Sequence, residues 1–224
     1  MCGRFAGFRE IDELMKYFPI DRAEATAVEN YNVAPSQPVL TVIREGGENV
    51  LETLNWGLVP FWAKDKSIDS ELINARMESV HEKPSFRNAF RKRRCLILAD
   101  GFYEWTGPKG DKQPVFITLP DGSPFAFAGL WEEWREKGAD ETYRSCTIIT
   151  GAASESVRDI HHRMPLVLTP GAYDRWLDTG YQDVEGLRDL LDKEIVTEFK
   201  FHKVSKQVNK ADCNDPSNLA PVET

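Results

Sequence analysis

The residue with the clearest chemistry lies at the start of the chain, which reads MCGRF. Because Cys2 is small, we expect the initiator Met1 to be trimmed, which leaves cysteine as the first residue of the mature chain. An N-terminal cysteine carries two neighbouring nucleophiles, an α-amine with a pKa near about 7.8 and a thiol with a pKa near about 8.5. With an aldehyde, the amine gives a Schiff base and the thiol then closes a thiazolidine ring, which hydrolyses far more slowly than the imine. The natural target of Cys2 is therefore an aldehyde.

Position alone does not distinguish this role from that of an ordinary small residue in a frayed terminus. Short motifs accompany Cys2 along the chain: YNVAPSQ, WGLVPFWAKD, INARMES, ADGFYEW, IHHRMP and VSKQVN. Together, and in this order over residues 2 to about 209, they resemble the SRAP family (SOS-response-associated peptidase), also called abasic-site processing proteins. The resemblance implies a single SRAP domain over residues 1–224 that captures abasic sites in single-stranded DNA covalently, in the DNA damage response.

The resemblance also implies an active site made of an N-terminal Cys, an Asn, a Glu and a His. These groups map onto Cys2, Asn74 of INAR, Glu104 of YEW and His161, the first histidine of HHRMP. His162 occupies the variable position of that motif, so we assign the role to His161 alone. We expect no cofactor and no metal.

Physical chemistry gives each of these side chains a role. An abasic deoxyribose is mostly a closed hemiacetal, and opening it requires proton transfer, which suits His161 as proton donor and shuttle. Glu104 is expected to deprotonate the α-amine and then to move protons during loss of water, while Asn74 orients groups by hydrogen bonds. A strand Glu beside aromatic residues can also be purely structural, and a His at a helix end can be a cap, so the motif context carries the assignment.

Candidate DNA contacts lie within or near the same motifs. For the arginines we expect phosphate binding, with a structural salt bridge as the alternative. For the tryptophans, together with Phe61, we expect stacking on exposed bases, with burial in the core as the alternative. The residues concerned are Arg4, Arg76, Arg163, Trp56, Trp62 and Trp105.

Other functions stay open. Cys2, His161 and Glu104 also have the composition of a thiol-nucleophile triad, so a thiol peptidase acting on other proteins is the alternative, and removal of the preceding residue is its restrained form. The Schiff base would also allow slow β-elimination, and hence weak lyase activity. A non-catalytic adaptor that binds single strands predicts that Cys2→Ala retains function, whereas the other hypotheses predict its loss.

The net charge of the chain is −8 and its pI is near 5.1, which argues against coating nucleic acid by bulk charge. A local patch can still bind DNA, and the stretch RNAFRKRR, residues 87–94, concentrates basic residues ahead of a strand-like segment. This stretch is either a solvated charged turn or part of a DNA-binding surface, and the sequence does not decide between them.

The remaining composition favours a soluble bacterial cytoplasmic protein, nucleoid-associated when bound to damage. Neither a run long and apolar enough to span a membrane nor a signal peptide is present in the sequence. The four cysteines are scattered without a C-x-x-C pair, which indicates neither zinc nor disulfides, and Cys95 and Cys146 lie in strand-like apolar runs typical of core thiols. We further expect a monomer.

Periodicity places these motifs on elements. Helical spacing over 8–18 is followed by alternating strands PVLTVIR and NVLETLNW around the turn EGGE. A second group of strands, paired antiparallel, is expected at RCLILADGFYEW, at PVFITLP and PFAFAGLW on either side of the turn DGS, and at YRSCTIIT. Helices are expected near 154–160, 170–177 and 184–193, followed by a last strand FKFHKV. Because no regular β-α-β alternation occurs, the prediction is an α+β fold with a curved, mainly antiparallel sheet or open barrel flanked by helices.

Overall fold

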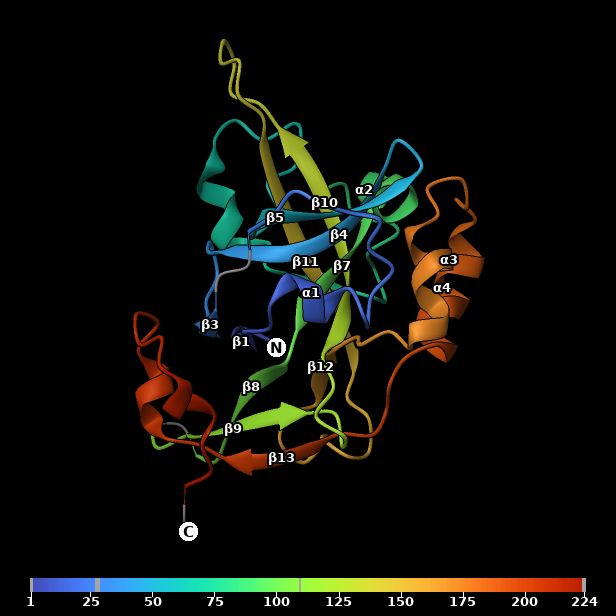
Figure 1. Ribbon diagram of the computed structural model, residues 1–224. Helices are drawn as coiled ribbons and strands as arrows, with labels where there is room; N and C mark the ends of the chain where they lie inside the picture. Colours follow the sequence, from blue (N-terminus) through green and yellow to red (C-terminus); the bar gives the residue numbers. More distant parts are fainter. Residues whose placement is uncertain (1, 27–28, 109, 223–224) are drawn as a thin grey trace.

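The computed structural model describes residues 2–26, 29–108 and 110–222, and its secondary structure is dominated by strands (Figure 1). The strands are β1 (Phe5–Gly7), β2 (Arg22–Ala23), β3 (Asn30–Val33), β4 (Pro38–Glu45), β5 (Glu48–Trp56), β6 (Asn74–Arg76), β7 (Arg94–Ala99), β8 (Gly101–Thr106), β9 (Gln113–Thr118), β10 (Phe125–Trp134), β11 (Tyr143–Ala152), β12 (Arg163–Pro165) and β13 (Lys200–Lys203). The α-helices are α1 (Ile11–Leu14), α2 (Arg87–Lys92), α3 (Tyr173–Leu177) and α4 (Val184–Lys193). The 3-10 helices are η1 (Lys66–Glu71), η2 (Pro170–Ala172), η3 (Lys206–Asn209) and η4 (Pro216–Leu219).

The larger sheet curls into a ring. Its strand order is β12-β11-β10-β7-β4-β5-β2, and the neighbours along β11-β10-β7-β4-β5 pair antiparallel. A short parallel pairing of β11 with β5, which places Cys146 opposite Trp56, joins the two ends of this run. The short strand β6 also pairs with β11 in parallel, outside the ring. The expected α+β fold with a curved, mainly antiparallel sheet or open barrel is confirmed.

The second sheet has the order β13-β9-β8-β1-β3 and lies against one end of the ring, in the lower part of Figure 1. The chain passes from one sheet to the other between β7 and β8, at Asp100. This carboxylate accepts hydrogen bonds from the backbone N–H of Phe8 (2.8 Å) and from the Arg9 side chain (2.6 Å). The run RCLILADGFYEW is therefore two strands in two sheets, because Asp100 ties the corner between them to the start of the chain.

Helices α3 and α4 cover one side of the ring (Figure 1). Leu187, Leu190 and Leu191 turn the apolar face of α4 into the core, and Asp183 caps its first turn by accepting from two backbone N–H groups. From α3, the buried Trp176 donates its indole N–H to the carbonyl of Cys95 on β7 (3.0 Å). The helix predicted over 184–193 is confirmed at both ends, and that over 170–177 forms as η2 followed by α3.

Three local expectations are wrong. The segment 154–160 forms turns, because the Ser156 hydroxyl ties it to a distant part of the chain: it donates to the carbonyl of Thr197 (2.8 Å) and accepts from the backbone N–H of Phe199 (3.3 Å). Helix α1 covers only part of 8–18 and continues as turns up to Phe18. PVFITLP and PFAFAGLW do not pair with each other, since β9 joins the smaller sheet and β10 joins the ring. No helix in the described ranges is long and apolar enough to cross a membrane.

Candidate active site

Cys2 reaches the interior because β1 pairs antiparallel with β8. The register aligns Phe5 with Phe102, and the backbone N–H of Tyr103 donates to the carbonyl of Arg4 (2.9 Å). Continued by two residues, this register places the start of the chain beside Glu104. Cys2 has no exposed surface. Burial raises the pKa of its thiol, and the nearby Glu104 carboxylate raises the pKa further. Met1 lies outside the described residues, so its removal stays a prediction.

Asn74 approaches Cys2 from the other sheet. It begins β6, whose parallel pairing with β11 aligns it with Ile148. Its side-chain N–H donates to the carbonyl oxygen of Cys2 at 2.8 Å. Its Oδ1 atom is buried and has no hydrogen-bond partner among the described residues. Asn74 therefore holds the first residues of the chain in place and presents an acceptor to whatever binds beside Cys2.

Glu104 and His161 complete the cluster. Glu104, on β8, is 5% exposed. His161 precedes β12, and its Nδ1 lies 3.0 Å from both the N–H and the carbonyl oxygen of Arg163, which fixes the ring. Burial lowers the pKa of His161, while the negative charge of Glu104 acts in the opposite direction. Because Glu104 acts on both the thiol of Cys2 and the imidazole of His161, the three groups share one electrostatic environment.

The four predicted residues therefore converge from two sheets: Cys2 precedes β1 and Glu104 lies on β8 of the smaller sheet, whereas Asn74 begins β6 and His161 precedes β12, two strands that pair with β11. The arrangement offers a buried nucleophile and a buried carboxylate beside a partly exposed imidazole and a partly exposed amide. Within the described part of the chain, no cluster of three or more His, Cys, Asp or Glu side chains has the geometry to hold a metal ion. The thiol, the carboxylate and the imidazole gathered here suit nucleophilic attack and proton transfer.

Two of the three predicted phosphate-binding arginines have partners within the protein. Arg163 makes a double ion pair with Glu78 (2.9 and 3.0 Å) and donates to the carbonyl of Thr150 (2.7 Å). Arg4 donates to the side chain of Asn32 (2.7 Å) and to the carbonyl of Val208 (2.8 Å). Arg76 is exposed at the end of β6. Of the three, Arg76 is the side chain that can meet a phosphate without giving up a hydrogen bond or ion pair to a described residue.

The tryptophans also separate. Trp56 has no exposed surface and donates its indole N–H to the carbonyl of Ile73 (2.9 Å), so base stacking on Trp56 is wrong for this structure. Its ring packs against Phe5 at 5.1 Å in the core. Trp62 and its neighbour Phe61 are about half exposed, at 49% and 53%. Trp105 is partly buried and donates to Asn209 Oδ1 (2.7 Å), with the Arg4 guanidinium 6.0 Å from its ring centre.

The loop between β5 and β6 carries Trp62 at one end and Asn74 at the other. Gly57 opens it with φ +136°, and a Cβ at this position would lie 2.5 Å from the carbonyl oxygen of Asp69, so only glycine fits. Farther along, Trp134 of β10 donates its indole N–H to the carbonyl of Ala63 (2.7 Å). The ammonium of Lys66 lies 4.3 Å from the ring centre of Tyr143. Residues of β10 and β11 thus hold this loop against the ring of strands.

Sequence reasoning missed the residues that hold the predicted ones. Asn32 is 1% exposed, and besides accepting from Arg4 it donates to the carbonyls of Lys210 (2.8 Å) and Cys213 (2.9 Å). Asn209 orients Trp105, and Glu78 orients Arg163. A signal existed for each, since Asn32 lies in YNVAPSQ, Glu78 in INARMES and Asn209 in VSKQVN, but their partners come from distant parts of the chain.

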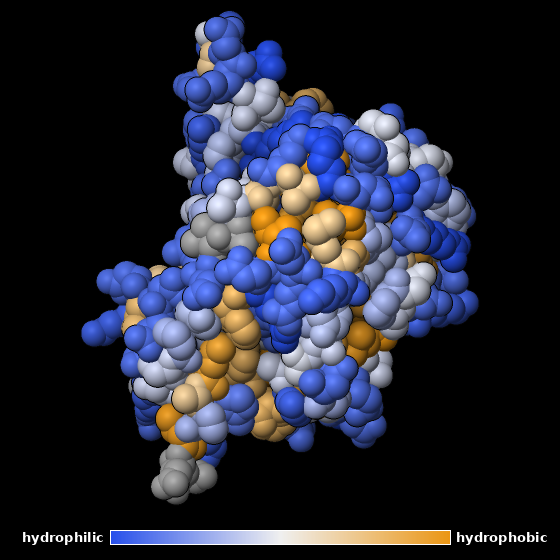
Figure 2. All heavy atoms as spheres, viewed as in Figure 1, coloured by the Kyte–Doolittle hydropathy of each residue, from blue (hydrophilic) through white to orange (hydrophobic). Residues whose placement is uncertain are grey.

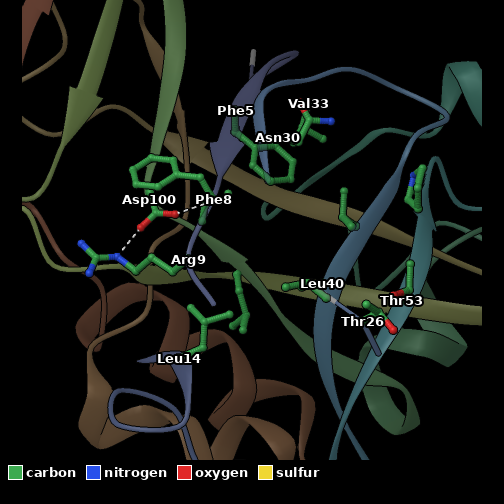
Figure 3. A pocket seen from close by; sticks show the side chains of 15 residues that line it. Phe5, Phe8, Arg9, Leu14, Thr26, Asn30, Val33, Leu40, Thr53 and Asp100 are labelled. Carbon is green, nitrogen blue, oxygen red and sulfur yellow. Dashed lines mark hydrogen bonds and ion pairs between the residues drawn. The ribbon is translucent and has the colours of Figure 1, made fainter. Parts of the chain in front are cut away.

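A separate cavity of about 100 Å³ lies between β1, α1, β4 and β7. Figure 3 shows Phe5, Leu14 and Leu40 around it, and the bonds of Asp100 to Arg9 and to the backbone of Phe8 on one side. On the corresponding face of Figure 2, apolar residues gather over β4 within a mainly hydrophilic surface. The cavity is lined by neither cysteine nor histidine, which separates it from the cluster around Cys2.

Comparison with known proteins identifies the family. A family model described as SOS response associated peptidase (SRAP) matches residues 1–211. The chain belongs to the SRAP family. It is 44% identical over 220 residues to the abasic site processing protein YoqW of Bacillus subtilis, covering 96% of this chain and 97% of that protein. It is 31% identical over 231 residues to the abasic site processing protein YedK of Escherichia coli, covering 99% of this chain and 100% of that protein.

The fold of this SRAP chain also matches solved structures. A crystal structure of a protein from Bacteroides thetaiotaomicron superposes with a TM-score of 0.83 at 24% identity, covering 100% of both chains. At this identity the likeness concerns the fold alone. Family membership therefore rests on the family model and the sequence relatives, and the structure contributes the positions of the side chains around Cys2.

Proposed function

We propose that this protein captures abasic sites in single-stranded DNA by a covalent bond to Cys2, and so shields the lesion from strand cleavage. The observation that carries the proposal is the convergence on Cys2 of Asn74, bonded to its carbonyl, and of Glu104, which acts on the pKa of its thiol and on that of His161. The names of the relatives, abasic site processing proteins, agree with this substrate.

The state of the thiol supports an order of steps. Because burial keeps the Cys2 thiol protonated, the α-amine freed by loss of Met1 is the first nucleophile. It adds to the C1′ aldehyde of the opened sugar, and loss of one water gives an imine. The sulfur then adds to the imine carbon while the thiol proton passes to the nitrogen. The product is a thiazolidine whose mass equals protein plus DNA minus water.

The neighbouring groups supply the proton transfers. With Nδ1 of His161 engaged by the backbone of Arg163, Nε2 is the atom through which this ring exchanges protons with the sugar. The Glu104 carboxylate accepts the proton of the α-amine and returns it to the hydroxyl that leaves as water. It then accepts the proton of the thiol and passes it to the nitrogen as the ring closes. The buried Oδ1 of Asn74, which lacks a partner among the described residues, accepts from a hydroxyl of the opened sugar.

The DNA-binding groups we assign are those the structure leaves exposed. Arg76 at the end of β6 suits a phosphate, and Trp62 suits an unpaired base next to the lesion. Trp105 stays in the proposal at the edge of the site, beside Arg4. Stacking of this kind needs unpaired bases, which favours single-stranded DNA, and one chain supplies every group, which favours a monomer.

Two further activities follow from the same chemistry. The imine intermediate acidifies the neighbouring sugar carbon, so Glu104 as a base would give slow β-elimination and hence weak lyase activity. Removal of Met1 by the protein itself would use the Cys2 thiol as nucleophile. A thiol peptidase acting on other proteins is the alternative that the same residues allow. Cys2→Ser separates DNA crosslinking from peptidase activity, since serine still serves a weak hydrolase but closes a less durable ring with an aldehyde.

The test uses a single-stranded oligonucleotide with one abasic site, mixed with the purified protein and weighed intact after denaturation. We expect an adduct equal to the protein without Met1 plus DNA minus water, absent in Cys2→Ala. A reduced-ring control, a tetrahydrofuran abasic analogue without an aldehyde, should give no adduct with either protein. Retention of Met1 together with no adduct would overturn the proposal and leave the peptidase hypothesis to be tested.

A further inference from the structure

The basic stretch RNAFRKRR splits in the structure into two sets of side chains with different surroundings. Arg94 is buried and donates to backbone carbonyls, among them those of Trp176 (2.6 Å) and Phe90 (3.0 Å). Arg93 makes a double ion pair with Glu132 (2.7 and 2.8 Å). Both arginines therefore have structural roles: Arg94 links α2 to α3, and Arg93 neutralises the buried carboxylate of Glu132.

The other basic residues form one exposed face of α2. Arg87, Arg91 and Lys92 are exposed, while Ala89 and Phe90 on the opposite face are buried. None of the three cations makes an ion pair with a described residue, and α2 itself contains no acidic residue. Although the chain has a net charge of −8, these three cations give α2 a locally positive surface that attracts a polyanion.

This face continues into the loop that carries the exposed aromatic residues. A surface groove is lined by Phe61, Asn88, Lys92, Arg93, Glu132 and Glu133. Its acidic members are already paired, Glu132 with Arg93 and Glu133 with Arg144 (2.8 Å). The groove thus combines Phe61, which is 53% exposed, with Lys92, which has no ion pair to a described residue. An aromatic ring next to a cation is the combination that binds the bases and backbone of a single strand.

We propose that the exposed face of α2, with Phe61, is a second contact for single-stranded DNA, which binds the strand flanking the lesion. The inference rests on the proposed function for its substrate but concerns residues outside the site around Cys2. Binding here is through phosphates, so it is independent of the lesion and sensitive to salt. Its role is to raise the affinity for single strands and to hold one flank while Cys2 reacts.

The experiment compares two variants with the same change in net charge. The first is Arg87→Ala/Arg91→Ala/Lys92→Ala, and the control is Arg175→Ala/Arg188→Ala/Lys193→Ala on α3 and α4. Fluorescence anisotropy of an undamaged single-stranded oligonucleotide is measured over a series of salt concentrations. Since each phosphate contact contributes about 0.7 to the slope of log K against log salt, we expect the slope of the α2 variant to be smaller by about 2. The control should keep the wild-type slope.

Further arms make the result decisive. Arg87→Lys/Arg91→Lys, which keeps the charge, should bind like the wild type. With abasic oligonucleotides, trimming one flank of the lesion should abolish the difference in affinity between the wild type and the α2 variant. The rate of adduct formation at saturating DNA should be equal in both proteins. Equal slopes for the α2 variant and the control would overturn the second contact. This outcome is independent of the adduct assay, in which a failure of the wild type would overturn the proposed function itself.

Discussion

Cys2 and the pair Cys95 and Cys146 lie in the same apolar cluster, yet only Cys2 has the surroundings of a reactive group. All three are free and without exposed surface, and burial raises the pKa of all three thiols. Around Cys2 lie the amide of Asn74 and the carboxylate of Glu104. Cys95 lies on β7 and Cys146 on β11, where Cys146 faces Trp131 across the ladder.

The difference teaches that burial of a thiol does not decide its role. Burial raises the pKa of Cys95 and Cys146, and no carboxylate of the described residues acts on either thiol. Both thiols therefore stay protonated and serve as packing groups. Cys2 has the carboxylate of Glu104 beside it, and removal of Met1 would free its α-amine. A buried thiol next to a proton acceptor is protected from oxidation yet able to react with a substrate that enters the site.

Replacing each cysteine in turn gives the largest contrast. Cys2→Ala should lower the yield of DNA adduct by more than about 100-fold, because it removes the ring-closing sulfur and leaves only a hydrolysable imine. Cys146→Ala should leave the adduct rate unchanged and reduce the free energy of unfolding by about 1 kcal/mol through lost packing. The measurements are adduct yield on denaturing gels and urea unfolding. A Cys146→Ala protein that folds but no longer forms the adduct would contradict the comparison.

A weaker effect should follow from removing the base while keeping the thiol. Glu104→Gln should slow adduct formation by about 100-fold, the lower range for loss of general acid–base catalysis. Rates are measured by quenching at saturating DNA. The matched control is Glu52→Gln, since Glu52 is also nearly buried but is paired with Arg144 (2.6 Å) on the ring, and it should react at the wild-type rate.

The amide beside Cys2 is expected to contribute less. Asn74→Ala removes the bond to the carbonyl of Cys2 and the acceptor Oδ1, which together position the residue. Loss of about 1.4 kcal/mol, the scale of one hydrogen bond, corresponds to an adduct rate about tenfold lower. Single-turnover rates at saturating DNA give the value. An unchanged rate would mean that the geometry of Cys2 is set by β1 and β8 alone.

The smallest expected effect is on stability as a function of pH. Burial lowers the pKa of His161 in the folded protein below its ordinary value of 6.5, so the unfolded chain binds the proton first as pH falls. The contribution of His161 is complete above about pH 6.5 and declines below it until the folded-state pKa is reached. Melting temperatures at about pH 7.5 and about pH 5.5 should therefore differ less in His161→Gln than in the wild type. An equal difference in both proteins would exclude this titration.

Local pattern predicted those parts of the fold that depend on neighbours in the sequence. The alternation in PVLTVIR and NVLETLNW predicted β4 and β5, and the helical pattern over 184–193 predicted α4. The segment 154–160 was mispredicted because the Ser156 side chain bonds to the backbone of distant residues, Thr197 and Phe199. Pairing of strands was beyond local pattern, since β9 and β10 follow one another but join different sheets.

The sequence by itself determined the α+β class and the family through its spaced motifs, and it predicted Cys2 and three further residues as the site. Only the tertiary structure decided which arginines and tryptophans remain exposed. Trp56 and Trp62 lie in one motif, yet one is in the core and the other half exposed, because β5 ends at Trp56 and the loop after Gly57 leaves the ring. Residue type sets what a side chain is able to do, and burial with its partners, which come from distant strands, sets what it is free to do.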